Sequence, residues 1–146
     1  MTHPHRLAIA LSVVLLGCGR GGPAPFTSAN PFATASPLFD QAPPFDRIHN
    51  ADFQPAIEEG MRRQLAEIAA IAADTAAPTF DNTIIAIERS GTLLQRVNNV
   101  FNALTSANTN DTLQQVQEAV APKLAVHRDA IFLNAPLFQR IRSVYE

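Results

Sequence analysis

The sequence predicts an all-α fold, and three observations lead to this prediction. Apolar residues recur at intervals of three or four positions through residues 45–146, which is the period of one face of a helix. Residues that commonly cap helices, namely Asp, Asn and Thr, stand where each of these runs begins. Hydrophobic residues make up 47% of the chain, which is enough for a packed core.

The first helix is expected to begin near Asp52, which can cap it. Pro55 would then lie in the first turn, where its missing N–H breaks no hydrogen bond. The expected apolar face consists of Phe53, Ile57, Met61, Leu65, Ile68 and Ala72. We expect Glu58–Arg62 and Glu59–Arg63 to form i,i+4 ion pairs on the solvated face rather than a catalytic carboxylate pair.

A second helix is expected to follow the break at residues 76–79, with Thr79 or Asp81 as its cap. Its apolar stripe consists of Ile84, Ile87, Gly91, Leu94, Val97, Phe101 and Leu104. Because Gly91 lies inside this stripe, we expect a close approach between two helices there.

A third helix is expected to start at Asn110 or Asp111. Its stripe consists of Leu113, Val116, Val120 and Leu124, and it continues through His127 and Ile131. Pro122 lies inside this pattern and predicts a kink or a break. Asn134 is the expected cap of a fourth helix, with Pro136 in its first turn and an apolar stripe of Leu137, Ile141 and Val144. The sequence stops inside this last pattern, so we expect residues 45–146 to be an incomplete helical region.

Residues 1–17 are expected to be a signal peptide. Arg6 precedes an uncharged run from Leu7 to Leu16, and a run of ten residues is too short to span a bilayer, which takes about 20. The run ends in Leu15-Leu16-Gly17-Cys18, which resembles a bacterial lipobox, so Cys18 is the candidate lipidation site. The alternative is an ordinary cleaved signal with an incidental cysteine. On the lipobox interpretation the chain is exported and anchored to a membrane, facing the periplasm.

Residues 18–44 are expected to form a tether between the lipid and the helices. Six of the eleven prolines and three of the six glycines lie between positions 19 and 44. Four phenylalanines are spaced along this part of the chain: Phe26, Phe32, Phe39 and Phe45. We expect the later ones to pack on the helices. The alternative is that they form a partner-binding motif.

The residues themselves show no catalytic or metal-binding constellation. A metallopeptidase helix would need two His four positions apart with a Glu between them, and this motif is absent from the chain. His49 and His127 lie far apart in the sequence and are expected to cap or pack. The single cysteine excludes an intramolecular disulfide and a multi-cysteine zinc site. The net charge of −2 argues against a nucleic-acid partner.

Five consecutive segments resemble the N-terminal region of the bacterial peptidyl-dipeptidases, also called dipeptidyl carboxypeptidases. The segments are PFDRIHNADFQPAIEEGM (44–61), APTFDNTIIAIERSG (77–91), RVNNVFNALTSANTND (96–111), LQQVQEAVAPKLAVHRDAIFLN (113–134) and LFQRIRSVYE (137–146). Oligopeptidase A, thimet oligopeptidase and neurolysin belong to the same group of enzymes. The resemblance covers roughly residues 30–146, and the NVFNALTSANTN stretch favours the peptidyl-dipeptidases over oligopeptidase A.

The resemblance implies a nearly all-helical zinc metallopeptidase with a deep channel that admits short peptides. In this family a His-Glu-x-x-His helix and a later Glu hold the zinc, which activates a water, and the peptidyl-dipeptidases release dipeptides from peptide C-termini. These ligands lie far beyond the N-terminal region. Consequently no catalytic residue and no metal ligand can be assigned to any position of this chain.

The leading hypothesis is therefore that the chain is the N-terminal fragment of an exported zinc metallopeptidase. On this hypothesis it supplies the export signal, the tether and part of the channel wall, and it is inactive alone. The alternative is a stand-alone helical lipoprotein that acts as an interaction module without catalytic activity. Under the leading hypothesis, apolar helix faces would lack partners and be exposed.

Overall fold

The computed structural model describes residues 23–146, and this part of the chain is all-α, as the sequence predicts. The predicted signal peptide and Cys18 lie outside the described residues. The described elements are a 3₁₀ turn η1 (Phe39–Gln41), α1 (Asn50–Ala73), a π-helical segment η2 (Phe80–Ile85), α2 (Ala86–Arg89), α3 (Thr92–Ala107), α4 (Asp111–Phe132) and α5 (Ala135–Tyr145).

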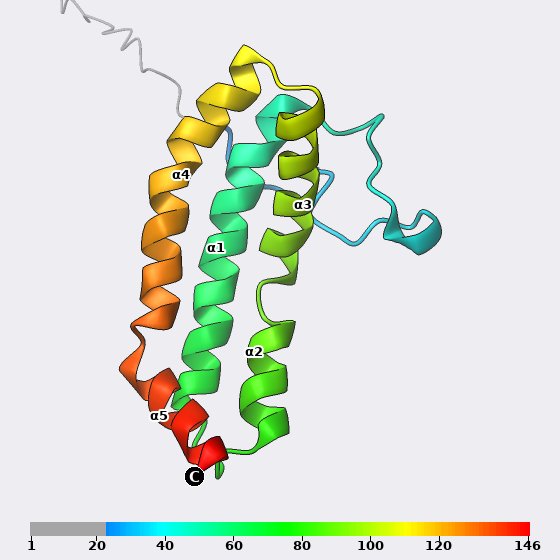
Figure 1. The fold of residues 1–146 in the computed structure, drawn as a ribbon. Helices are drawn as coiled ribbons and strands as arrows, with labels where there is room; N and C mark the ends of the chain where they lie inside the picture. Colours follow the sequence, from blue (N-terminus) through cyan, green and yellow to red (C-terminus); the bar gives the residue numbers. More distant parts are fainter. Residues whose placement is uncertain (1–22) are drawn as a thin grey trace, which may run out of the picture.

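Helix α1 is the centre of the molecule, and it contacts each of the other four α-helices that the structure describes. Figure 1 shows α4 along one side of α1 and the successive helices α2 and α3 along the other. The short helix α5 crosses the lower end of α1 in this view. The helices therefore lie side by side, and α1 has neighbours on both flanks.

The start of α1 differs from the sequence prediction. The helix begins at Asn50, and His49 rather than Asp52 is its N-cap residue. Asp52 instead occupies the third helical position, where its Oδ2 accepts a 2.7 Å hydrogen bond from the main-chain N–H of His49. Pro55 consequently lies beyond the first turn, where its ring removes one hydrogen bond of the helix.

The predicted second helix is in fact two stretches separated at Ser90 and Gly91. Thr79 caps the first stretch, η2 and α2, and its Oγ1 accepts a 3.1 Å hydrogen bond from the N–H of Asn82. Gly91 adopts a left-handed conformation with φ of 71°, which ends helical geometry before α3 begins. Figure 1 shows α2 and α3 end to end along α1, which explains why one apolar stripe runs through both.

The predicted caps of the last two helices are confirmed. Asn110 accepts a hydrogen bond from the N–H of Leu113 at the start of α4, and Asn134 accepts one from Leu137 at the start of α5. Helix α4 runs without a break from Asp111 to Phe132. Of the predicted kink or break at Pro122, the break is therefore wrong. Val120 packs in the core before the proline, and His127 contacts Gln64 of α1 after it.

A contiguous apolar core fills the upper part of the molecule in Figure 1, between α1, α3 and α4. The ring of Phe53 lies between those of Phe32 and Phe101, at centroid distances of 5.4 and 5.2 Å. The buried members of this core are Phe32, Phe53, Ala56, Ile57, Met61, Leu93, Leu94, Val97, Val100, Phe101, Leu113, Val116 and Val120.

Helices α1 and α3 lie close together at Gly60. A Cβ atom at this position would lie 2.8 Å from the Cα of Leu94, which is closer than atoms can pack. The close helix approach expected from Gly91 therefore occurs at a different glycine. Gly91 instead faces the side chain of Gln64, where a Cβ would lie 2.4 Å from the amide carbon.

The segment before α1 packs differently from the sequence prediction. Phe32 is buried and Phe26 is partly buried against the core, whereas Phe39 and Phe45 are 96% and 55% exposed. It is thus the earlier phenylalanines, and not the later ones, that pack on the helices. The Nη2 of Arg96 donates to the carbonyl of Phe32 at 2.8 Å, so the packed body begins before residue 45.

Candidate functional site

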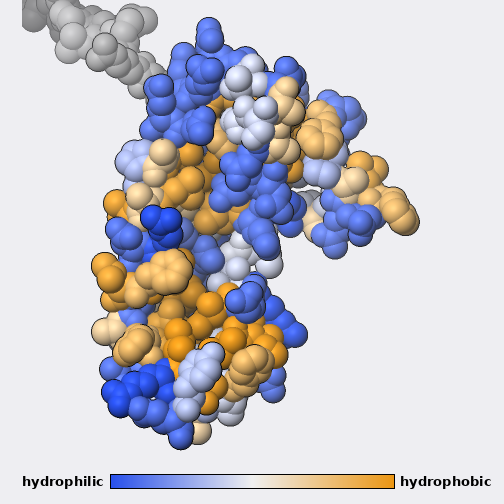
Figure 2. All heavy atoms as spheres, viewed as in Figure 1, coloured by the Kyte–Doolittle hydropathy of each residue, from blue (hydrophilic) through white to orange (hydrophobic). Residues whose placement is uncertain are grey.

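An apolar hollow lies at the lower end of the molecule in Figure 1, between α1, α2, α4 and α5. We call it the basal groove, and it is lined by Ile68, Ile87, Ile131, Leu137 and Ile141. Its volume is about 430 Å³. Figure 2 shows hydrophobic side chains gathered around a depression over this part of the surface. The predicted exposed apolar face is therefore present.

The basal groove exists because α5 places its apolar stripe beside α1 and α4. Leu137 is buried, while Ile141 and Val144 are only partly covered. Two phenylalanines at the groove, Phe132 at the end of α4 and Phe138 in α5, are 78% and 57% exposed. Large exposed aromatic side chains beside an apolar hollow are typical of a surface that another segment covers.

One wall of the basal groove carries a chain of polar side chains. The Nε2 of His127 lies 2.8 Å from Oε1 of Gln64, and Nε2 of Gln64 lies 3.4 Å from Oγ of Ser90. The hydroxyl of Ser90 donates to the carbonyl of Ile87 at 2.7 Å. Because Gln64 separates Ser90 from His127, these residues form no hydroxyl–imidazole pair of the kind that generates a nucleophile.

The protonation of His127 follows from these contacts. Oε1 of Gln64 is an acceptor, so Nε2 of His127 carries the proton in the neutral imidazole. Its Nδ1 is buried and has no hydrogen-bond partner among the described residues. Burial lowers the pKa of His127 below its usual value, because a charged imidazole would lose its hydration. His127 is thus a neutral packing residue, as the sequence predicts.

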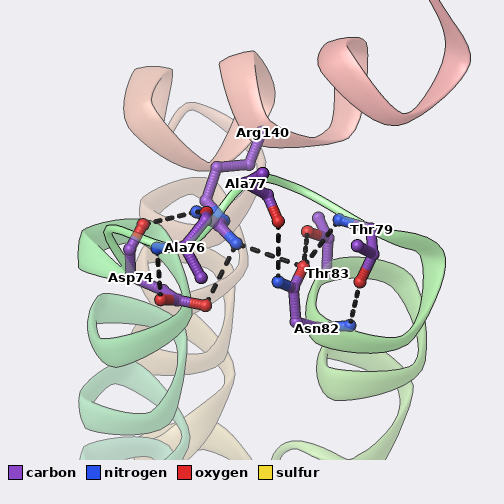
Figure 3. Close-up of polar contacts among 7 residues, drawn as sticks. All are labelled: Asp74, Ala76, Ala77, Thr79, Asn82, Thr83 and Arg140. Carbon is purple, nitrogen blue, oxygen red and sulfur yellow. Dashed lines mark hydrogen bonds and ion pairs between the residues drawn. The ribbon is translucent and has the colours of Figure 1, made fainter.

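A second polar cluster centres on Arg140, which is buried at the end of α1 (Figure 3). Its Nη1 donates to the carbonyls of Asp74 and Ala76, at 2.5 and 3.1 Å. Its Nη2 lies 3.2 Å from both Oδ2 of Asp74 and Oδ1 of Asn82. The guanidinium group therefore connects α5 to the end of α1 and to the start of η2.

Asn82 completes this cluster from the other side. Its Oδ1 also accepts hydrogen bonds from the N–H of Thr79 at 2.8 Å and from Oγ1 of Thr83 at 3.0 Å. Its Nδ2 donates to the carbonyl of Ala77 at 3.0 Å. Every polar atom of the Asn82 side chain is thus used to hold the loop between α1 and η2 (Figure 3). The Arg140 cluster is a structural connection rather than an open binding site.

The predicted ion pairs on α1 are partly confirmed. Glu59 pairs with Arg63 at 2.8 Å, as expected, and also with Arg62 at 2.7 Å. The hydrogen bond from Arg62 is the main reason that the pKa of Glu59 falls to about 2. The Glu58–Arg62 pair is wrong, because Glu58 instead contacts Lys123 of α4 at 2.5 Å. Both glutamates are thus held in ion pairs with basic side chains.

Within residues 23–146, no group of three or more His, Cys, Asp or Glu side chains could hold a metal ion. His49 lies at the start of α1 and His127 in the wall of the basal groove, and the fold does not bring them together.

No family model matches the chain. A stretch of 100 residues is 47% identical to the dipeptidyl carboxypeptidase of Salmonella typhimurium strain LT2. A stretch of the same length is 48% identical to the dipeptidyl carboxypeptidase of Escherichia coli strain K12. The chain is related to dipeptidyl carboxypeptidases. This finding confirms the resemblance carried by the five sequence segments.

The match with the dipeptidyl carboxypeptidases makes up 68% of this chain but only 15% of the length of each relative. The chain thus spans a small part of the dipeptidyl carboxypeptidases that it matches.

Neither polar cluster, the one around Gln64 or the one around Arg140, was predicted from the sequence. Arg140 lies in a helix whose apolar stripe was visible, but its partners Asp74 and Asn82 are distant in sequence. The partners of Gln64, which are Ser90 and His127, are also distant from it in the sequence. The one available signal was that Arg140 falls three residues after Leu137, on the stripe that α5 buries.

Proposed function

We propose that this chain is the N-terminal helical part of an exported dipeptidyl carboxypeptidase. The enzyme would be a zinc metallopeptidase that hydrolyses short peptides and releases dipeptides from their C-termini. The observation that carries this proposal is the identity of 47–48% over 100 residues to two dipeptidyl carboxypeptidases. The catalytic groups would lie in the part of such a protein that this chain does not span.

The described residues do not fit a zinc site, so no catalytic step is assigned to them. Their role in the proposed enzyme is to build part of the wall around the peptide channel. The basal groove supports this role, because an apolar surface beside exposed phenylalanines is suited to contact with further protein.

The proposal includes export through residues 1–17 and lipidation at Cys18, which would anchor the protein to a membrane facing the periplasm. The support is the short apolar run that ends in Leu-Leu-Gly-Cys. Within residues 23–146, no helix is both long enough and apolar enough to cross a bilayer. Globomycin treatment, which blocks the lipoprotein signal peptidase, should cause the unprocessed form to accumulate, and Cys18→Ser should abolish lipid labelling.

The test of the enzymatic proposal is to read the coding DNA beyond the Glu146 codon and to express the complete product. We expect an open frame that encodes His-Glu-x-x-His and a later Glu. The purified product should release dipeptides from the C-termini of short peptides, lose this activity with a chelator and regain it with zinc. A stop codon directly after Glu146, or a complete product without peptidase activity, would refute the proposal.

The alternative is a stand-alone helical lipoprotein that binds a partner and has no catalytic activity. The continuous core between α1, α3 and α4 favours it, because such a core can support an independent fold. Thermal unfolding of residues 23–146 discriminates between the two. A sharp transition without binding of a hydrophobic dye supports the stand-alone module, whereas a broad transition with strong dye binding supports a part of a larger fold.

A further inference from the structure

We propose that the basal groove binds an amphipathic helix from the remainder of the longer protein, and that this helix carries a carboxylate next to its apolar face. This inference rests on the proposed function, because it requires a chain that continues beyond the described helices. It goes further in that it names the docking surface and the chemistry of the segment that docks there.

The two ends of the molecule differ in how far their apolar residues are covered. At the upper end, the segment before α1 covers the core, and Phe32 is only 2% exposed. At the lower end, no described segment covers the basal groove, and Phe132 is 78% exposed. The described part of the chain therefore covers one apolar region and leaves the other uncovered.

The relatives contain a long stretch of chain that could supply a segment to cover the basal groove. If 100 residues are 15% of each relative, the relatives have about 100/0.15 ≈ 670 residues, and about 570 of these lie outside the match. A segment in the same chain is present at a high effective concentration, which favours it over a separate partner. The remainder of the longer protein is therefore the occupant that we assign.

The basal groove carries a positive charge. Arg128 of α4 lines the groove and makes no ion pair with any residue that the structure describes. Gln64, which also lines the groove, is already bonded to His127 and Ser90, so Arg128 is the charged group at the groove that an occupant can neutralise. An apolar helix with an Asp or Glu next to its stripe would cover the apolar lining and pair with Arg128.

The test is photo-crosslinking in the protein made from the complete reading frame. Benzoylphenylalanine is placed at position 138, which lies at the groove, or at position 126, where Val126 is 70% exposed on α4 outside the groove. We expect position 138 to crosslink within the same molecule to a helical peptide beyond residue 146, at least several-fold more efficiently than position 126. The crosslinked peptide should carry Asp or Glu beside its apolar residues.

Two results would overturn the assignment. A crosslink between two molecules, seen as a doubled mass, would show that a second copy covers the groove. Equal and low yields at positions 138 and 126 would show that the groove stays open. A stop codon directly after Glu146 refutes both proposals, whereas an open frame with an unlinked position 138 refutes only the docking assignment.

A pair of substitutions gives an independent measurement. Phe132→Asp and Val126→Asp both alter exposed apolar residues of α4, at 78% and 70% exposure. In the longer protein Phe132→Asp should lower the melting temperature by several degrees and Val126→Asp should not. Similar small effects of both substitutions in the longer protein would count against the docking helix.

Discussion

Arg140 in α5 donates a hydrogen bond from Nη1 to the carbonyl of Asp74, which is the residue that follows the last turn of α1. A second nitrogen of the same guanidinium lies 3.2 Å from the Asp74 carboxylate. One side chain therefore satisfies both the main chain and the charge where α1 ends. This contact sets the position of α5, and α5 in turn forms one wall of the basal groove.

Replacing Arg140 should strongly destabilise the described fold. Arg140→Met would leave the carbonyls of Asp74 and Ala76 without their donor, and we expect a loss of about 2–4 kcal/mol in the free energy of unfolding. Arg140→Lys should recover little, because an ammonium group cannot reproduce the planar fork of donors. Urea denaturation measures both changes.

Arg142→Met is the matched control for the Arg140 variants. Arg142 lies in the same helix and pairs with Glu146, but both side chains are more than half exposed. An exposed pair of this kind contributes about 0–1 kcal/mol. If the Arg140 and Arg142 variants were equally stable, Arg140 would not hold α5 to α1.

Phe32→Ala should show that the segment before α1 is part of the fold. Phe32 is 2% exposed and packs on Phe53, so its truncation should lower the free energy of unfolding by about 3–5 kcal/mol. Phe39→Ala removes an identical side chain that is 96% exposed, and its effect should stay within about 0.5 kcal/mol. Equal effects in thermal unfolding would mean that residues 23–44 act only as a tether.

The effect of Gly60→Ala on stability should show whether the close packing of α1 on α3 outweighs the helix propensity of alanine. Alanine in a helix interior is normally more stable than glycine by about 1 kcal/mol. Here the new Cβ would lie 2.8 Å from the Cα of Leu94, so α1 and α3 must move apart and we expect a net loss of about 1–3 kcal/mol.

The control for Gly60→Ala is Ala69→Gly on the exposed face of α1, which reports the propensity effect alone. A gain in stability for Gly60→Ala, measured in the same denaturant series, would contradict the close contact between α1 and α3.

Stability should fall as the pH decreases below about 6.5, because burial lowers the pKa of His127 in the folded state. As the pH falls, His127 of the unfolded chain binds a proton before His127 of the folded chain does. The contribution of His127 to the free energy of unfolding is therefore complete above the pKa of the unfolded state and is lost progressively below it. The slope contributed by one proton is at most about 1.4 kcal/mol per pH unit. His127→Gln should flatten the pH dependence of the free energy of unfolding between pH 5 and pH 6.5.

His49→Gln is the control for the pH experiment, because the side chain of His49 is 79% exposed. Measuring above pH 5 also keeps the titration of His127 apart from that of Glu59. The pKa of Glu59 is lowered to about 2, chiefly by its hydrogen bond with Arg62, so its contribution is lost only as the pH falls below about 4.5. An unchanged pH dependence in His127→Gln would show that another group is responsible.

The apolar period of the sequence was sufficient to predict the fold class and the faces of the helices. Phe53, Ile57 and Ile68 are all buried on the predicted face of α1, because a helix places residues three and four positions apart on one side. The caps Thr79, Asn110 and Asn134 were equally visible, because capping depends on the main chain within three residues. The helix break at Gly91 was not visible, since α2 and α3 continue the same stripe.

The family relationship was also available from the sequence, since five ordered segments carry it through the helices. What the sequence alone did not determine is which residues meet across long separations. Phe32 rather than Phe45 covers the core, Glu58 reaches Lys123 instead of Arg62, and Arg140 joins α5 to α1. Local hydrogen bonding and periodicity are encoded within a few residues, and the sequence therefore determines them directly. Contacts between distant segments depend on how the helices pack, so only the tertiary structure decided the position of the basal groove.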